Sequence, residues 1–149
     1  MDAREFLARV IEPNVTELTH DPTSVQRAWN AVVSLLQFAD YVAIDKGSKP
    51  DREAADLIET WPRFAQVRDI GNALKHAERG SGPRTGLSAR HVKTGSGAAF
   101  SDGSYYSDGS SHSDAETVLR IEFNGEFVDL VHLCEECVVF LRAHSPPAP

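Results

Sequence analysis

Six polar residues in one short segment recur at intervals that place them on one face of an α-helix: Arg68, Asp69, Asn72, Lys75, His76 and Arg79. With about 100° of turn per residue, all six fall within about 120° of one another. An arginine can hold a phosphate through two parallel hydrogen bonds, and a lysine adds a point charge. A histidine, with an ordinary pKa of about 6.5, is suited to general acid–base work. The segment therefore predicts a helix face that contacts a phosphate.

The same segment also has an apolar side. Val67, Ile70 and Leu74 lie on the opposite half of the helical wheel, so the helix is amphipathic and buries one side. The simpler interpretation is that the polar side is the solvated face of a core helix, since charged residues on an outer face need no further cause. Both interpretations stay open at the level of the sequence.

The order of residues from Arg68 to His76 resembles the signature of HEPN domains. These are small helical bundles whose motif is an arginine, usually followed by a polar residue, with a histidine further along the helix. Asp69 stands at the position of that polar residue. In catalytic members the motif cleaves RNA without a metal ion, in a site assembled across a dimer. The resemblance implies that His76 assists attack by the RNA 2′-hydroxyl and that Arg68 stabilises charge on the phosphorane.

The spacing departs from the HEPN pattern, because the interval from Arg68 to His76 is longer than the usual one in that family. The two residues are two turns apart, roughly 12 Å along the helix axis, so both can touch one polynucleotide but meet at one phosphate only with help from a second subunit. A second resemblance is to uncharacterised bacterial and phage-encoded proteins with an Asp-x-x-Asn-x-x-Lys-His helix, here Asp69, Asn72, Lys75 and His76. It implies no activity.

The apolar spacing predicts the helices that must position this face. The first predicted helical segment is 3–11, stopped by Pro13. The strongest follows the start signal Asp21-Pro22-Thr23, with apolar residues from Val25 onward, up to Gly47. A shorter helix after Pro50, a helix that starts near Pro62 and runs to about residue 79, and a last helix from about 130 to 144 complete the set. Pro62 is equally compatible with a kink in one long helix. The sequence predicts a mainly α fold, a bundle of about four helices. Trp29 and Trp61 lie at core spacing and are expected to pack inside.

A small β-hairpin is expected before the last helix. Leu119, Ile121 and Phe123 alternate with polar residues as in a half-buried strand, and Asn124-Gly125 is typical of a two-residue hairpin turn. Residues 80–116, by contrast, hold seven of the ten glycines and nine serines, and predict a flexible Gly/Ser-rich insertion within a single domain of 1–149. Residues 145–149 are expected to form a disordered tail.

Length and charge restrict the function classes. The 149 residues fit one domain, and the net charge of −7 argues against a dedicated duplex-DNA binder. The charge is unevenly distributed, because 63–93 holds seven basic residues against two acidic ones and carries +5, which leaves −12 for the remainder. A local site for an anion is compatible with this distribution. No segment is predicted to span a membrane or direct secretion, so a cytoplasmic protein is expected.

Cys134 and Cys137 form a Cys-x-x-Cys pair, which is a common half-site for zinc. On the predicted last helix both fall in the apolar stripe while His132 points away, so we expect small core residues and no metal or cofactor. Two functions remain. The first is a HEPN-like protein that contacts RNA or nucleotide and that, as a catalytic member, would also cleave RNA without a metal ion. The second is a non-catalytic protein–protein interaction module whose partner is unknown. Asp69, Asn72, Lys75 and Arg79 would bind the substrate. The HEPN resemblance also implies a homodimer.

Overall fold

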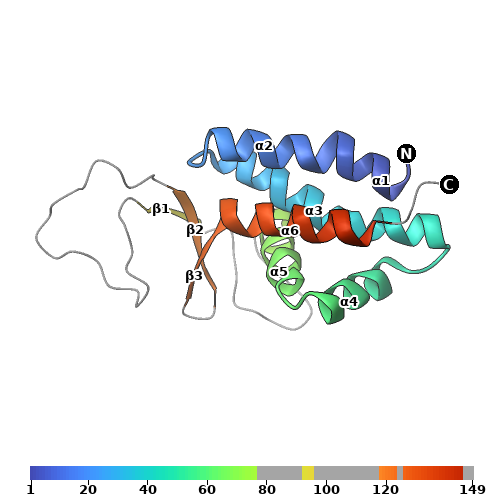
Figure 1. The fold of residues 1–149 in the computed structure, drawn as a ribbon. Coiled ribbons are helices and arrows are strands. Elements are labelled where there is room, and N and C mark those ends of the chain that lie inside the picture. Colours follow the sequence, from blue (N-terminus) through green and yellow to red (C-terminus); the bar gives the residue numbers. More distant parts are fainter. Residues whose placement is uncertain (77–91, 96–117, 124–125, 146–149) are drawn as a thin grey trace, which may run out of the picture.

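The computed structural model describes residues 1–76, 92–95, 118–123 and 126–145 (Figure 1). Within these ranges the protein is mainly helical, with a small antiparallel sheet before the last helix, which confirms the predicted fold class. Several predicted features lie outside the described residues: Arg79, the Asn124-Gly125 turn, 146–149 of the tail, and the predicted insertion 80–116 apart from residues 92–95.

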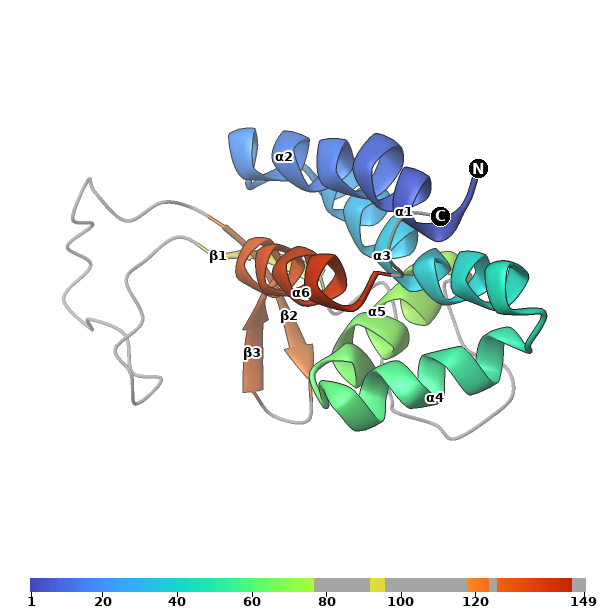
Figure 2. The ribbon, with the colours of Figure 1, turned by 45° about the vertical axis from the view of Figure 1, so that its right-hand side comes forward.

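The helical segments are α1 (Ala3–Phe6), the π-helical η1 (Leu7–Ile11), α2 (Glu12–His20), α3 (Val25–Lys46), α4 (Pro50–Thr60), α5 (Phe64–His76) and α6 (Leu130–His144). The strands are β1 (Val92–Gly95), β2 (Val118–Phe123) and β3 (Glu126–Asp129). The central helix is α3, which contacts every other α-helix. In Figure 2 the rod formed by α1, η1 and α2 lies above α3, whereas α4 and α5 lie below it. The core is therefore built around α3.

The N-terminal helix does not stop at Pro13, which corrects the prediction of a helix over 3–11. Helical structure continues from Ala3 to His20, with Pro13 in the first turn of α2. Directly before it, in the π-helical turn, the N–H of Glu12 donates to the carbonyl of Leu7, five residues back. Proline lacks an N–H and crowds the preceding turn, and a π-helical turn is one of the irregularities that let a helix continue past such a site.

Helix α3 ends at Gly47 as its sequence predicts, but its capping residue is Ser24, directly after the predicted start signal. Ser24 caps its start by accepting a hydrogen bond from the N–H of Arg27, and Gly47 ends it in the left-handed conformation with φ of 64°. The expectation for Trp29 is wrong, because this side chain is 38% exposed. Val25, one turn earlier on α3, is 53% exposed.

The sheet has the strand order β1-β2-β3 and is antiparallel throughout. Leu119 and Ile121 are buried while Arg120 is half-buried, as the predicted alternation requires. Strand β1 was not predicted, because four residues of mixed type carry too little apolar periodicity and depend on β2 for their backbone hydrogen bonds. The N–H of Leu119 also donates to the carbonyl of Pro22, which joins the sheet to the turn before α3.

The last helix contributes the cysteines to the core. Cys134 and Cys137 are fully buried, which confirms their prediction as core residues, and burial raises the pKa of both thiols. Asp129 caps this helix by accepting from the N–H of His132. Within the described ranges, none of the helices combines the length and the apolar character that a membrane span requires.

Helices α3 and α5 approach each other closely at Gly71, which is buried in the middle of α5. A Cβ atom at this position would lie 3.1 Å from Cδ2 of Leu36 and 3.2 Å from its Cβ. It would also lie 3.5 Å from the carbonyl oxygen of Val32. Glycine in a helix interior normally costs about 1 kcal/mol relative to alanine. Here its small size permits the close contact, and a larger side chain would push α5 away from α3.

We expect Gly71→Val to lower the free energy of unfolding by about 1–3 kcal/mol, because an added isopropyl group must fit against Leu36. Urea unfolding followed by circular dichroism measures the change. Ala55→Val on the exposed side of α4 is the matched control, since it introduces the same β-branched residue into a helix without a close neighbouring helix. Valine has a higher helix propensity than glycine and a lower one than alanine, so a loss in Gly71→Val no larger than that in Ala55→Val would contradict a close α3–α5 contact.

Candidate functional site

A groove with a volume of about 360 Å³ lies between α3, α4 and α5. Its lining includes four of the six polar residues singled out in the sequence: Arg68, Asp69, Asn72 and Lys75. They come from three successive turns of α5, where their spacing puts them on one side of the helix. The structure therefore brings these four predicted residues to one site.

Arg68 and Asp69 interact within the groove. Nε of Arg68 donates to Oδ1 of Asp69 at 3.1 Å, with the arginine side chain 39% exposed and the carboxylate 7% exposed. Asp69 was expected on an open polar face, and its burial differs from that expectation because α5 packs against both α3 and α4. Within the described residues, no hydrogen bond involves the two terminal amino groups of Arg68. These groups are the ones a guanidinium uses to hold a phosphate oxygen pair.

The other walls of the groove come from residues that the sequence analysis did not single out. Helix α3 contributes Gln37 and Asp40 among apolar residues, and the first turn of α4 contributes Pro50 and Asp51. In the sequence, Gln37 and Asp40 interrupt the apolar pattern of α3, and this interruption was the feature that could have marked them as site residues. It was insufficient, because the sequence alone does not show which helices pack beside α5.

The charge of the groove is mixed. Two cations, Arg68 and Lys75, face three carboxylates, Asp40, Asp51 and Asp69. The helix face predicted from the sequence, which already included Asp69, therefore lines a groove to which α3 and α4 add two further carboxylates. Such a lining suits a ligand that carries both an anionic group and hydrogen-bond donors.

His76 is the last described residue of α5, and its backbone follows Lys75 directly. Its side chain lies outside what the structure describes, as does all of Arg79. From Arg68 to His76 the helix rises by roughly 12 Å. The structure thus places Arg68, Asp69, Asn72 and Lys75 together, while the positions of the other two side chains stay predictions.

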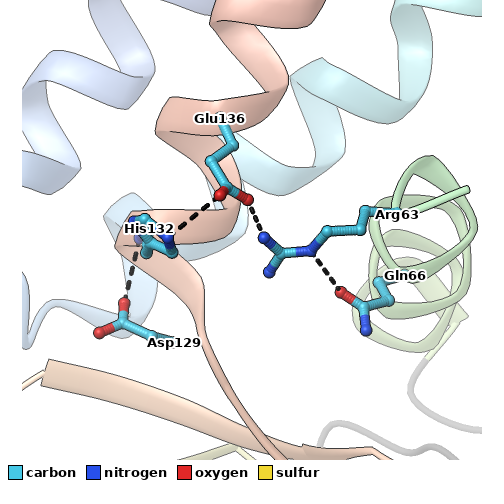
Figure 3. A network of polar contacts seen from close by, with 5 residues as sticks. All are labelled: Arg63, Gln66, Asp129, His132 and Glu136. Atoms are coloured by element: carbon cyan, nitrogen blue, oxygen red, sulfur yellow. Dashed lines mark hydrogen bonds and ion pairs between the residues drawn. The ribbon is translucent and has the colours of Figure 1, made fainter. Parts of the chain in front are cut away.

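A second polar cluster joins the start of α5 to α6 (Figure 3). Glu136 of α6 accepts from Nη1 of Arg63, and its other oxygen lies 3.1 Å from Nε2 of His132. Nε of Arg63 also donates to Oε1 of Gln66 at 3.4 Å. One basic residue of the +5 segment is therefore used inside the fold, to hold the first turn of α5 in place. His132 is 64% exposed, as its position on the helical wheel predicts.

Within the described ranges, no three His, Cys, Asp or Glu side chains are grouped so that they could hold a metal ion. Comparison of the chain with models of known protein families, with curated proteins and with solved structures finds no match. The chemistry of the groove must therefore be argued from its own residues.

The α4 wall of the groove is held by a buried carboxylate. Glu53, which is 4% exposed, accepts from Nζ of Lys46 at 2.8 Å and from Oγ of Ser48 at 2.6 Å. These two donors flank the turn at Gly47, so Glu53 joins the first turn of α4 to the end of α3. The hydrogen bonds from Lys46 and then from Ser48 lower the pKa of Glu53 below its ordinary value of 4.5.

Because the pKa is lower in the folded state, the Glu53 carboxylate stabilises the protein above pH 4.5, and this contribution is lost as the pH falls from 4.5 toward the lowered pKa. We expect Glu53→Gln to lower the free energy of unfolding at neutral pH by about 1–3 kcal/mol. The variant should also lose less stability than the parent protein on acidification.

Thermal unfolding over a pH series measures both effects. Glu59→Gln, on the exposed side of α4, should behave like the parent protein. A parallel pH dependence in parent and Glu53→Gln proteins would contradict the assignment.

Proposed function

We propose that the groove between α3, α4 and α5 binds a nucleotide unit of single-stranded RNA. The observation that supports this proposal is the convergence of Arg68, Asn72 and Lys75 on one groove of about 360 Å³. That volume falls within the roughly 300–1,000 Å³ typical of small-ligand sites. A site of this size takes one nucleotide and does not follow a duplex backbone.

The cations of the groove suit a phosphate. The half-exposed guanidinium of Arg68 offers two terminal amino groups in a planar fork, which matches a pair of phosphate oxygens. Lys75 is exposed, also lines the groove, and adds a second positive charge there. The half-buried amide of Asn72 lies between them in sequence and both donates and accepts hydrogen bonds.

The carboxylates of the groove suit the rest of a nucleotide. Asp40 and Asp51 are exposed acceptors that can bind ribose hydroxyls or the exocyclic amino groups of bases. They would repel a second phosphate placed beside them. A 2′-hydroxyl that donates to one of these carboxylates would favour RNA over DNA, because DNA lacks that donor.

Cleavage is the activity that the HEPN resemblance adds to binding. In that reaction the 2′-hydroxyl loses a proton to His76 and attacks the adjacent phosphorus. The 5′-oxygen of the next nucleotide leaves and takes a proton from water, and the hydroxide so formed is neutralised by the proton that His76 releases, so the products are a 2′,3′-cyclic phosphate and a 5′-hydroxyl. Arg68 would stabilise the charge on the phosphorane. The rise from Arg68 to His76 favours a second subunit as the source of one group, so the homodimer implied by the resemblance stays part of the hypothesis.

We expect a short labelled single-stranded RNA to bind the protein, and Arg68→Ala to weaken binding by about 10- to 150-fold, since a hydrogen-bonded charge is removed. Lys75→Ala should weaken it less, because its ammonium is exposed. Fluorescence anisotropy at fixed salt measures the affinities. Arg9→Ala on η1 is the control, because it removes the same charge from an exposed position outside the groove.

The same samples decide between binding and cleavage. RNA is incubated in EDTA with the parent protein, with Arg68→Ala and with His76→Ala, each checked for native circular dichroism. Cutting by the parent protein alone would establish a metal-independent nuclease, whereas bound but intact RNA would establish a binding protein. Equal weakening by Arg68→Ala and Arg9→Ala would remove the groove from the proposal. Absence of both binding and cleavage would leave the protein–protein interaction module as the function.

A further inference from the structure

Trp29 is a large aromatic side chain that the fold leaves 38% exposed. The other tryptophan, Trp61, stacks on Phe140 with ring centroids 5.1 Å apart. Among the described residues, no aromatic ring stacks on Trp29. Trp29 therefore presents aromatic surface that the described part of the fold does not use, and such surface can contact an external aromatic ligand.

Trp29 lies beside the groove. It precedes Val33 by four residues on α3, and Val33 lines the groove. Residues four apart on a helix are neighbours, with their Cβ atoms about 5–6 Å apart. Trp29 is therefore one helical turn, roughly 6 Å along α3, from a residue that lines the groove.

The charge along α3 favours a strand that leaves the groove on this side. Between Asp21 and Asp40 the sequence contains no acidic residue, although the whole chain carries a net charge of −7. At the opposite side, Asp40 and Asp51 line the groove and would repel an emerging phosphate. A polyanion bound at Arg68 and Lys75 therefore meets less repulsion along the Trp29 stretch of α3 than past the two aspartates.

We infer that Trp29 is a stacking platform for the base that adjoins the nucleotide in the groove. This inference rests on the proposed function and extends it from one nucleotide to two. Stacking on an aromatic ring needs no particular base, because every base has a π-face, so the site takes single-stranded RNA with little sequence preference. Duplex RNA does not fit, since its bases are stacked and paired and do not expose a face to the indole.

The test uses the fluorescence of Trp29 itself. In a Trp61→Phe variant, Trp29 is the one remaining tryptophan, and phenylalanine preserves the aromatic contact with Phe140. The probes are a hexamer of cytidylate RNA and a hexamer of the same ribose-phosphate backbone without bases. We expect the base-bearing hexamer to quench Trp29, and the abasic hexamer to bind more weakly without quenching it.

Affinity measurements with the unlabelled hexamers complete the test. Trp29→Ala should weaken binding of the cytidylate hexamer by about 5- to 150-fold, and Trp29→Phe should restore much of the loss. Neither change should alter binding of the abasic hexamer. Val139→Ala, which shortens an exposed apolar side chain on α6, should leave both affinities unchanged. Thermal unfolding of each variant verifies that it is folded.

The possible failures are distinguishable. If binding depends on Arg68 but neither the affinity nor the fluorescence depends on Trp29, the stacking inference is overturned and the proposed function stands. If the parent protein binds neither hexamer, the proposed function fails and the inference fails with it. Equal weakening of both hexamers by Trp29→Ala would also overturn stacking, because the abasic probe has nothing to stack.

Discussion

The close contact of α5 with α3 at Gly71 is the constraint on which the candidate site depends. Without a side chain at this position, the α5 backbone lies against Leu36 and the Val32 carbonyl. The adjacent turns then bring Arg68 and Asn72 to the surface of α3 and α4. A helix face that would otherwise be solvated becomes one wall of a groove, and its charges act on whatever the groove holds.

Two polar anchors keep the helices around that contact in place. Glu53 joins α4 to the end of α3 through Lys46 and Ser48, and Glu136 holds Arg63 at the start of α5. The Glu53 carboxylate is 5% exposed, so loss of its donors would leave a buried charge without partners, although Lys46 itself is 54% exposed. Both partners of the second anchor are more than a third exposed, so that ion pair is worth less. Positioning of the groove therefore depends more on the α3–α4 connection than on the link to α6.

The mixed charge of the groove changes the chemistry expected from α5 alone. Asp69 holds Nε of Arg68, so the guanidinium stays oriented while its terminal groups lie in the groove. Asp40 and Asp51 place negative charge on the walls opposite these groups. Under the proposed function, they would repel a second phosphate inside the groove, so the groove itself would hold one phosphate of a bound strand.

The sequence by itself determined most of the helices, because apolar spacing is local: α3 ends at Gly47 and Cys134 lies in the core, both as predicted. It also identified Arg68 and Lys75, since one helix fixes their common face. Only the tertiary structure decided which neighbours face them, that Asp69 is buried, and that a π-helical turn carries the first helix past its proline. The physical reason is that burial and charge environment arise between helices far apart in sequence, whereas periodicity describes each helix alone.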